Sequence, residues 1–167
     1  MHRALLTIVG VILAAPLAAA QAQPLQFQLS FDATTLDAPF TGRVFVLIRT
    51  NPVSPSNAMS WFRPEPGVAK DVRDWKPGVP LVLGAGAIEY PAPLKPGKYH
   101  VMAVMDRDLG GRSFADSPGN LYSTPRLLEL DPRTSGTIEL KLDRVVAERK
   151  FPETQSVRLV DIPSALL

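Results

Sequence analysis

Three aspartates and a pair of glycines lie within the segment MDRDLGGRSFAD at residues 105–116. Asp106 and Asp108 have the i, i+2 spacing of a calcium-binding loop, and Asp116 is the acid nearest to the position where such a loop closes. A hard cation such as Ca²⁺ takes several oxygen ligands, so these three side chains are the candidate metal ligands. The alternative is a plain polar turn, because Asp forms local backbone hydrogen bonds and Gly readily adopts positive φ. Calcium is the one candidate cofactor, and both interpretations stay open.

Four aromatic residues are candidates for a ligand-binding or interface surface, namely Trp61, Phe62, Trp75 and Tyr122. The first three lie in a long, proline-rich segment at residues 51–80. Exposed tryptophans could form a platform on which a sugar ring stacks, which makes a carbohydrate the second candidate ligand. The alternative is a small hydrophobic cluster that holds this segment against the core.

Nucleophilic catalysis finds little support in the residues. No serine has glycines at both the −2 and +2 positions, so the nucleophile elbow G-x-S-x-G is absent from the sequence. The chain has no cysteine, and beyond residue 22 it has a single histidine, His100, inside an apolar run. A self-sufficient Ser-His-Asp hydrolase is therefore not expected, and the candidate catalytic residues are none.

The segment SPGNLYS, which directly follows the aspartates, has the composition of a turn. Ser117-Pro118-Gly119-Asn120 fits a type II turn, with Pro at i+1 and Gly in positive φ at i+2. Residues 76–78 (KPG) and 95–98 (KPGK) predict two further turns of the same kind.

The elements that must position these residues are short strands. With 17 prolines and 11 glycines the chain is punctuated throughout, and no long helical pattern survives. Apolar runs and period-2 alternation predict an all-β fold, an antiparallel β-sandwich of immunoglobulin-like or transthyretin-like type with about seven strands. The clearest of the predicted strands are residues 25–31, 43–49, 98–106, 126–130 and 136–143.

The ends of the chain point to export. Residues 1–22 combine a basic start, an apolar run and small residues at an Ala-x-Ala site, which is typical of a signal peptide. We expect a β-sandwich domain at 23–150, and a last strand or exit segment at 151–167 that leads towards a following domain. Periplasmic or secreted bacterial localisation, without a membrane anchor after cleavage, follows from this pattern. The 18 basic and 16 acidic residues show no basic cluster, so no nucleic-acid partner is expected.

The order of several motifs along the chain resembles that of a known family. Five segments follow one another along the chain: WKPGVPLVL (75–83), AIEYPAPLKPGKYHVMAVMD (87–106), SPGNLYSTP (117–125), GTIELKLDRVV (136–146) and VRLVDIPSALL (157–167). In this order they resemble the N-terminal β-sandwich of bacterial secreted esterases of the enterochelin-esterase-like α/β-hydrolase type. The resemblance covers about residues 25–167, and no position matches that family's nucleophile, acid or histidine.

The resemblance implies a non-catalytic accessory domain of an exported protein. Its expected partner is a neighbouring hydrolase domain or protein, and any serine esterase activity would reside in that partner. The alternative is a periplasmic ligand-binding module that acts alone on calcium or carbohydrate.

Overall fold

The chain folds into β-strands joined by turns and loops. The computed structural model describes residues 22–57, 66–84, 88–89, 93–107, 113–114 and 117–148, with 154–156, 158, 160 and 163. Within these residues there is no α-helix, only the short 3-10 turn η1 (Pro55–Asn57), and no helix is long and apolar enough to cross a membrane. The nine strands are β1 (Gln23–Ser30), β2 (Phe40–Arg49), β3 (Gly67–Trp75), β4 (Leu81–Leu83), β5 (Ile88–Glu89), β6 (Gly97–Asp106), β7 (Leu121–Ser123), β8 (Arg126–Leu130) and β9 (Ser135–Val145).

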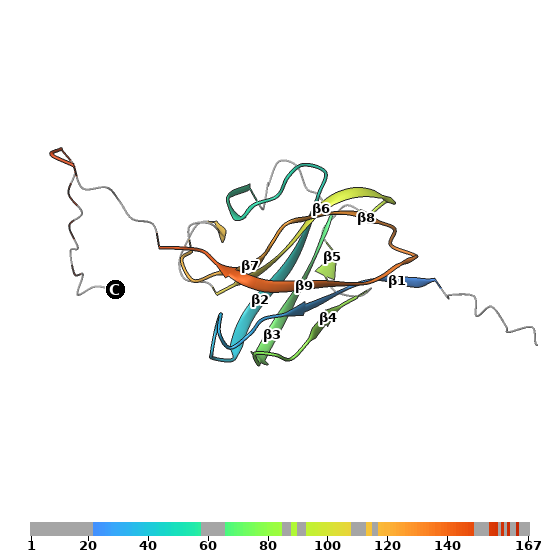
Figure 1. The fold of residues 1–167 in the computed structure, drawn as a ribbon, viewed down its shortest axis with the longest axis horizontal. Helices are drawn as coiled ribbons and strands as arrows, with labels where there is room; N and C mark the ends of the chain where they lie inside the picture. Colours follow the sequence, from blue (N-terminus) through green and yellow to red (C-terminus); the bar gives the residue numbers. More distant parts are fainter. Residues whose placement is uncertain are drawn as a thin grey trace, which may run out of the picture.

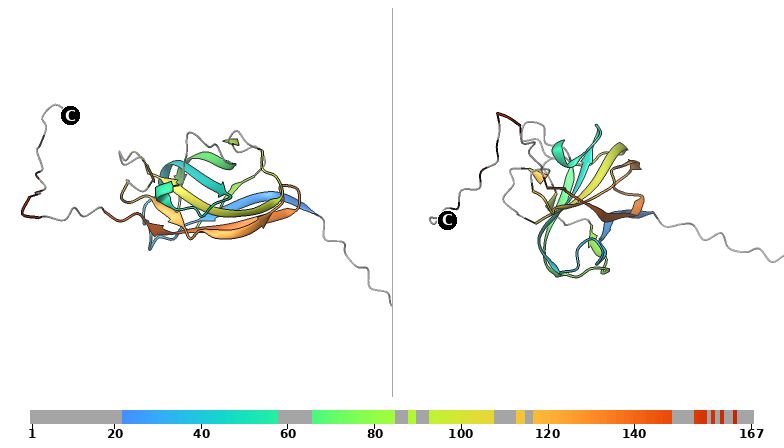
Figure 2. Two further views of the ribbon diagram at one scale, coloured as in Figure 1. Left: turned by 90° about the horizontal axis from the view of Figure 1, so that it is seen from above. Right: turned by 60° about the vertical axis from the view of Figure 1, so that its left-hand side comes forward.

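The strands form one path with the order β4-β1-β9-β7-β6-β2-β3-β5, and β8 pairs with β6 beside that path (Figure 1). Figure 2 shows β1 and β9 in blue and orange on one side of the core, with β2, β3 and β6 on the other. The path almost closes on itself. The prediction of an all-β chain is confirmed, whereas the immunoglobulin-like or transthyretin-like sandwich stays a prediction.

Strand β9 joins the two sides of the fold. Its first part pairs with β1 in a parallel ladder, where Leu29 lies opposite Leu140. Its last part pairs with β7 in an antiparallel ladder, where Leu121 lies opposite Val145. The prediction of an antiparallel fold is therefore wrong at the ladder between β1 and β9. The cause is topological, because the pairing of β1 with β9 joins the two ends of the strand sequence without a hairpin.

Strands β2 and β6 are buried on both faces, which explains their continuous apolar runs. Residues 44–48 and 101–105 are all buried and lie side by side in an antiparallel register. Alternate residues of β2, such as Val44 and Val46, face a main core. Phe45 and Leu47 point to the opposite face, where they join a second hydrophobic cluster. The second cluster consists of Phe45, Leu47, Val53, Ala69, Met102, Val104 and Phe114, with Tyr122 packed against it.

Two sequence expectations differ from the structure. Strand β3 lies inside the segment 51–80, which was expected to be a long excursion. The sequence did not predict this strand, because its outward-facing charged residues interrupt the apolar alternation that marks a strand. The predicted turn at 95–98 is wrong, since Gly97 does not have positive φ but begins β6 opposite Leu130. The predicted signal peptide lies outside the described residues except for residue 22, and the exit segment is described only at 154–156, 158, 160 and 163.

Candidate functional site

The turn predicted from SPGN is confirmed. The Asn120 backbone N–H donates to the Ser117 carbonyl at 3.1 Å, and Gly119 has φ of 92°. This combination is that of a type II turn with glycine at i+2. Two further backbone hydrogen bonds tie the turn to Val146 just after β9, at 2.9 Å from the Gly119 N–H and 2.8 Å to the Asn120 carbonyl. The turn is thus clamped onto the end of the sheet.

The side chain of Asn120 is the central polar group beneath this turn. It is fully buried, at 0% exposure. Its Oδ1 accepts the Arg107 backbone N–H at 2.9 Å, and its Nδ2 lies 3.4 Å from Asp106 Oδ1 and 3.5 Å from the Phe114 carbonyl. One amide therefore connects the end of β6, the loop after it and the turn. The sequence identified Asn120 only as a turn residue, because its buried partners come from segments that no local pattern brings together.

The three candidate calcium ligands are only partly placed by the structure. Asp106 ends β6, is half-buried and receives the Asn120 amide. Asp108 and Asp116 lie outside the described residues, so a calcium site stays a prediction. Within the described part of the chain, no three His, Cys, Asp or Glu side chains lie close enough to share a metal ion.

Two serines of this region have buried hydroxyls with backbone partners. Ser123 is 2% exposed, and its Oγ accepts the Ala103 N–H at 2.9 Å, next to a register shift between β7 and β9. Ser117 is 3% exposed, and its hydroxyl donates to the Ser113 carbonyl at 3.4 Å. The Ser123 hydroxyl pairs with a backbone N–H of β6, and the Ser117 hydroxyl pairs with a backbone carbonyl of its own loop. Neither is presented to solvent as a nucleophile would be.

The candidate aromatic residues separate into different environments. Trp75 is 6% exposed, meets Phe31 edge-on at 4.8 Å between ring centroids and donates its indole N–H to the Val79 carbonyl at 2.7 Å. It is therefore a core residue, with no exposed face on which a sugar could stack. Tyr122 is half-buried against the second cluster. Trp61 and Phe62 lie outside the described residues.

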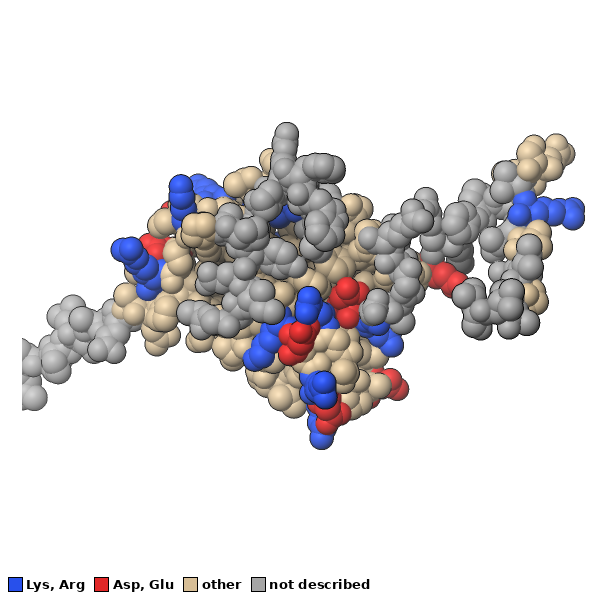
Figure 3. All heavy atoms as spheres, turned by 180° about the vertical axis from the view of Figure 1, so that it is seen from behind, with Lys and Arg blue, Asp and Glu red and all other residues tan. Residues whose placement is uncertain are grey.

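The charged residues mostly lie on the surface, where Figure 3 shows Lys and Arg side chains next to Asp and Glu. The most regular pair joins Arg43 of β2 to Asp71 of β3, with Nε–Oδ1 and Nη2–Oδ2 distances of 2.6 and 2.8 Å. The hydrogen bond from the Arg43 guanidinium, followed by its charge, holds the pKa of the Asp71 carboxyl below its ordinary value. On the other side of the fold, Asp32 raises the pKa of Lys141 through a similar ion pair.

The Arg43–Asp71 pair leads to a prediction about pH. We expect a carbon-13 NMR titration to give Asp71 a pKa below that of an ordinary Asp, and Arg43→Gln to raise it. Because the folded-state pKa is lowered, the pair adds stability above the unfolded-state pKa and loses it as the pH falls through the folded-state pKa. The two side chains are 47% and 64% exposed, so solvent keeps this contribution small. Arg73→Gln on β3 is the control, and an equal shift of the Asp71 pKa in that variant would contradict the assignment.

The structure also reveals a pocket that the sequence did not indicate. It lies at one end of the nearly closed sheet, beside the start of β1, the start of β3 and the end of β4, and has a volume of about 210 Å³. Its described lining residues all have apolar side chains or are glycines, while polar backbone atoms form a substantial part of its surface. The lining residues come from six separate segments, so no local motif could have identified them.

Comparison of the chain with protein families, with curated proteins and with solved structures finds no match.

Proposed function

We propose that this chain is a non-catalytic β-domain of an exported protein, which packs against a neighbouring hydrolase domain or protein and shapes access to it. The motif order from WKPGVPLVL to VRLVDIPSALL, with its resemblance to the N-terminal domain of secreted esterases, motivates the proposal. In this proposal the fold is a two-layer sandwich, with β4, β1 and the first part of β9 as one layer.

One structural observation carries the non-catalytic part. Three of the polar side chains described between residues 106 and 123 hold their own loop and strands: Asn120 with the Arg107 N–H, Ser123 with the Ala103 N–H and Ser117 with the Ser113 carbonyl. A nucleophile or general base must instead reach a substrate atom within hydrogen-bond distance. These residues therefore favour a structural role for the loop.

A second observation supports a shared contact surface. Val53, from the segment after β2, and Phe114, from the loop after β6, both pack on the second cluster. The Phe45 and Phe114 rings lie 5.0 Å apart between centroids. Two segments far apart in sequence thus meet on the same face of β2 and β6. In the proposal, the two segments that cover this face carry the contact with the neighbouring domain.

An esterase assay tests the proposal directly. We expect the purified chain to release p-nitrophenol from acetate and butyrate esters no faster than buffer does. A serine esterase assayed in parallel, with and without a serine-directed inhibitor, is the control for the substrates and the inhibitor. Turnover by the chain that the same inhibitor abolishes would refute the non-catalytic role.

A further inference from the structure

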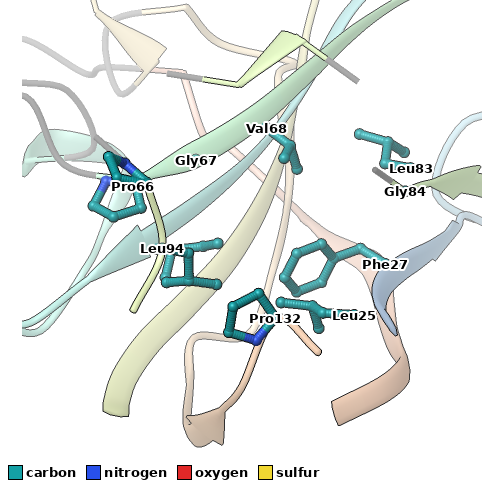
Figure 4. Close-up of a pocket in the computed structure, with 11 residues that line it drawn as sticks. Leu25, Phe27, Pro66, Gly67, Val68, Leu83, Gly84, Leu94 and Pro132 are labelled. Carbon is teal, nitrogen blue, oxygen red and sulfur yellow. The ribbon is translucent and has the colours of Figure 1, made fainter. Parts of the chain in front are cut away.

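We propose that the apolar pocket at the end of the sheet is a binding site for a small apolar molecule of about the size of benzene. Figure 4 shows Leu25, Phe27, Val68, Leu83 and Leu94 directed toward one common space. These side chains come from β1, β3, β4 and the segment that precedes β6. Pockets at the ends of closed or nearly closed sheets are frequent ligand sites.

The lining decides the chemical class of the ligand. Phe27, Ile48 and Leu83 belong to the main core, whereas Leu25, Val68 and Leu94 are half-buried at its edge. The other described lining residues are three prolines and two glycines, and none of the described lining residues is charged. The side chains offer dispersion contacts and no charge, and the polar groups at the surface belong to the backbone, so the pocket favours a hydrocarbon over a sugar or an ion.

Some polar backbone groups at the rim of the pocket already form hydrogen bonds with each other. The Leu25 N–H donates to the Pro132 carbonyl at 3.0 Å, which joins the start of β1 to the turn after β8. This hydrogen bond uses a donor and an acceptor that a sugar hydroxyl would otherwise require. The pocket is nevertheless reachable, because Leu94 is half-buried and the adjacent Pro93 is exposed.

The volume sets the size of the ligand. Apolar cavities of about 150 Å³ lined by Leu, Ile and Phe stay dry and bind benzene. The present pocket measures about 210 Å³, is open to solvent, and has Leu, Ile and Phe among its lining residues. Benzene therefore fits, with room for one or two further carbon atoms, whereas a drug-sized ligand does not.

Thermal unfolding with benzene as the probe tests this proposal. When benzene exceeds its Kd about tenfold, we expect the Tm to have risen by about 3–6 °C and to rise further with the logarithm of the benzene concentration, because a ligand bound only by the folded state stabilises it. Val68→Phe places a ring in the pocket and should abolish the rise. Val82→Phe makes the same change on β4 at a residue that is 43% exposed and does not line the pocket, and should leave the rise intact.

Amide chemical shifts of the unchanged protein provide a second readout that does not depend on any variant folding. Benzene should move the amide signals of Leu25, Val68 and Leu94, while glucose at equal concentration should not. The proposal is overturned by the absence of a saturable shift at these amides. It is equally overturned if folded Val68→Phe responds to benzene as the unchanged protein does. The esterase assay has no bearing on either result.

Discussion

Replacement of Asn120 by alanine is expected to lower the free energy of unfolding by about 2–4 kcal/mol. The Asn120 side chain is fully buried and contacts the Arg107 N–H, the Asp106 carboxylate and the Phe114 carbonyl. Alanine removes all three hydrogen bonds at once, and a buried polar group without a partner loses its hydration without compensation. Urea unfolding measured by circular dichroism gives the change in free energy.

Two further observations make this prediction specific. Asn51→Ala is the matched control, because Asn51 is exposed and the same substitution there should change stability by less than about 0.5 kcal/mol. Hydrogen exchange of the Arg107 amide should also become faster in Asn120→Ala, since that N–H loses its acceptor. Equal stabilities of the two variants would show that the Asn120 amide does not hold the loop.

The second large effect is expected for Gly42→Ala in β2, with a loss of about 2–4 kcal/mol. A Cβ atom at Gly42 would lie 2.6 Å from Phe40 Cζ and 2.9 Å from the backbone carbonyl oxygen of Asp106. Phe40 is 4% exposed, so its ring has little room to move, and the Asp106 carbonyl belongs to the paired strand β6. The change therefore forces β2 away from β6. It does so at the point where the register of β2 with its other neighbour, β3, shifts.

Two other glycines separate the contributions to that loss. Gly78 has φ of 75°, and a Cβ atom added there would have no other atom within 4 Å, so Gly78→Ala should cost about 1 kcal/mol through backbone conformation alone. Gly84 has ordinary φ and a nearest Cβ contact of 3.7 Å, so Gly84→Ala should be close to neutral. If Gly42→Ala cost no more than Gly78→Ala, the close approach of Gly42 to Phe40 and Asp106 would not constrain the residue at this position.

These two predictions concern neighbouring parts of the fold. Asp106 is the backbone partner of Arg43, the residue after Gly42, and its carboxylate receives the Asn120 amide. The end of β6 is therefore fixed from both sides, by strand pairing and by a buried amide. This rigidity is expected of a domain that presents a fixed contact face, as in the proposed accessory role.

Much of the fold could be predicted because local patterns specify it. The alternation in residues 25–31 and 136–143 and the apolar runs at 43–49 and 98–106 correspond to β1, β9, β2 and β6. The turn at 117–120 was predictable because Pro followed by Gly restricts the backbone independently of the rest of the chain. Strand β3 was missed because Lys70, Asp71, Arg73 and Asp74 face solvent and obscure its buried positions.

The sequence by itself determined the strands with clear apolar patterns, the turns at 76–78 and 117–120, and the chemical types available to any site. Only the tertiary structure decided that Trp75 is a core residue and that Asn120 joins three segments. It also decided that residues from six separate segments form a pocket. The physical reason is the range of the interactions. Propensity, periodicity and turn geometry act over a few residues, whereas burial and hydrogen-bond partners depend on which distant strands meet.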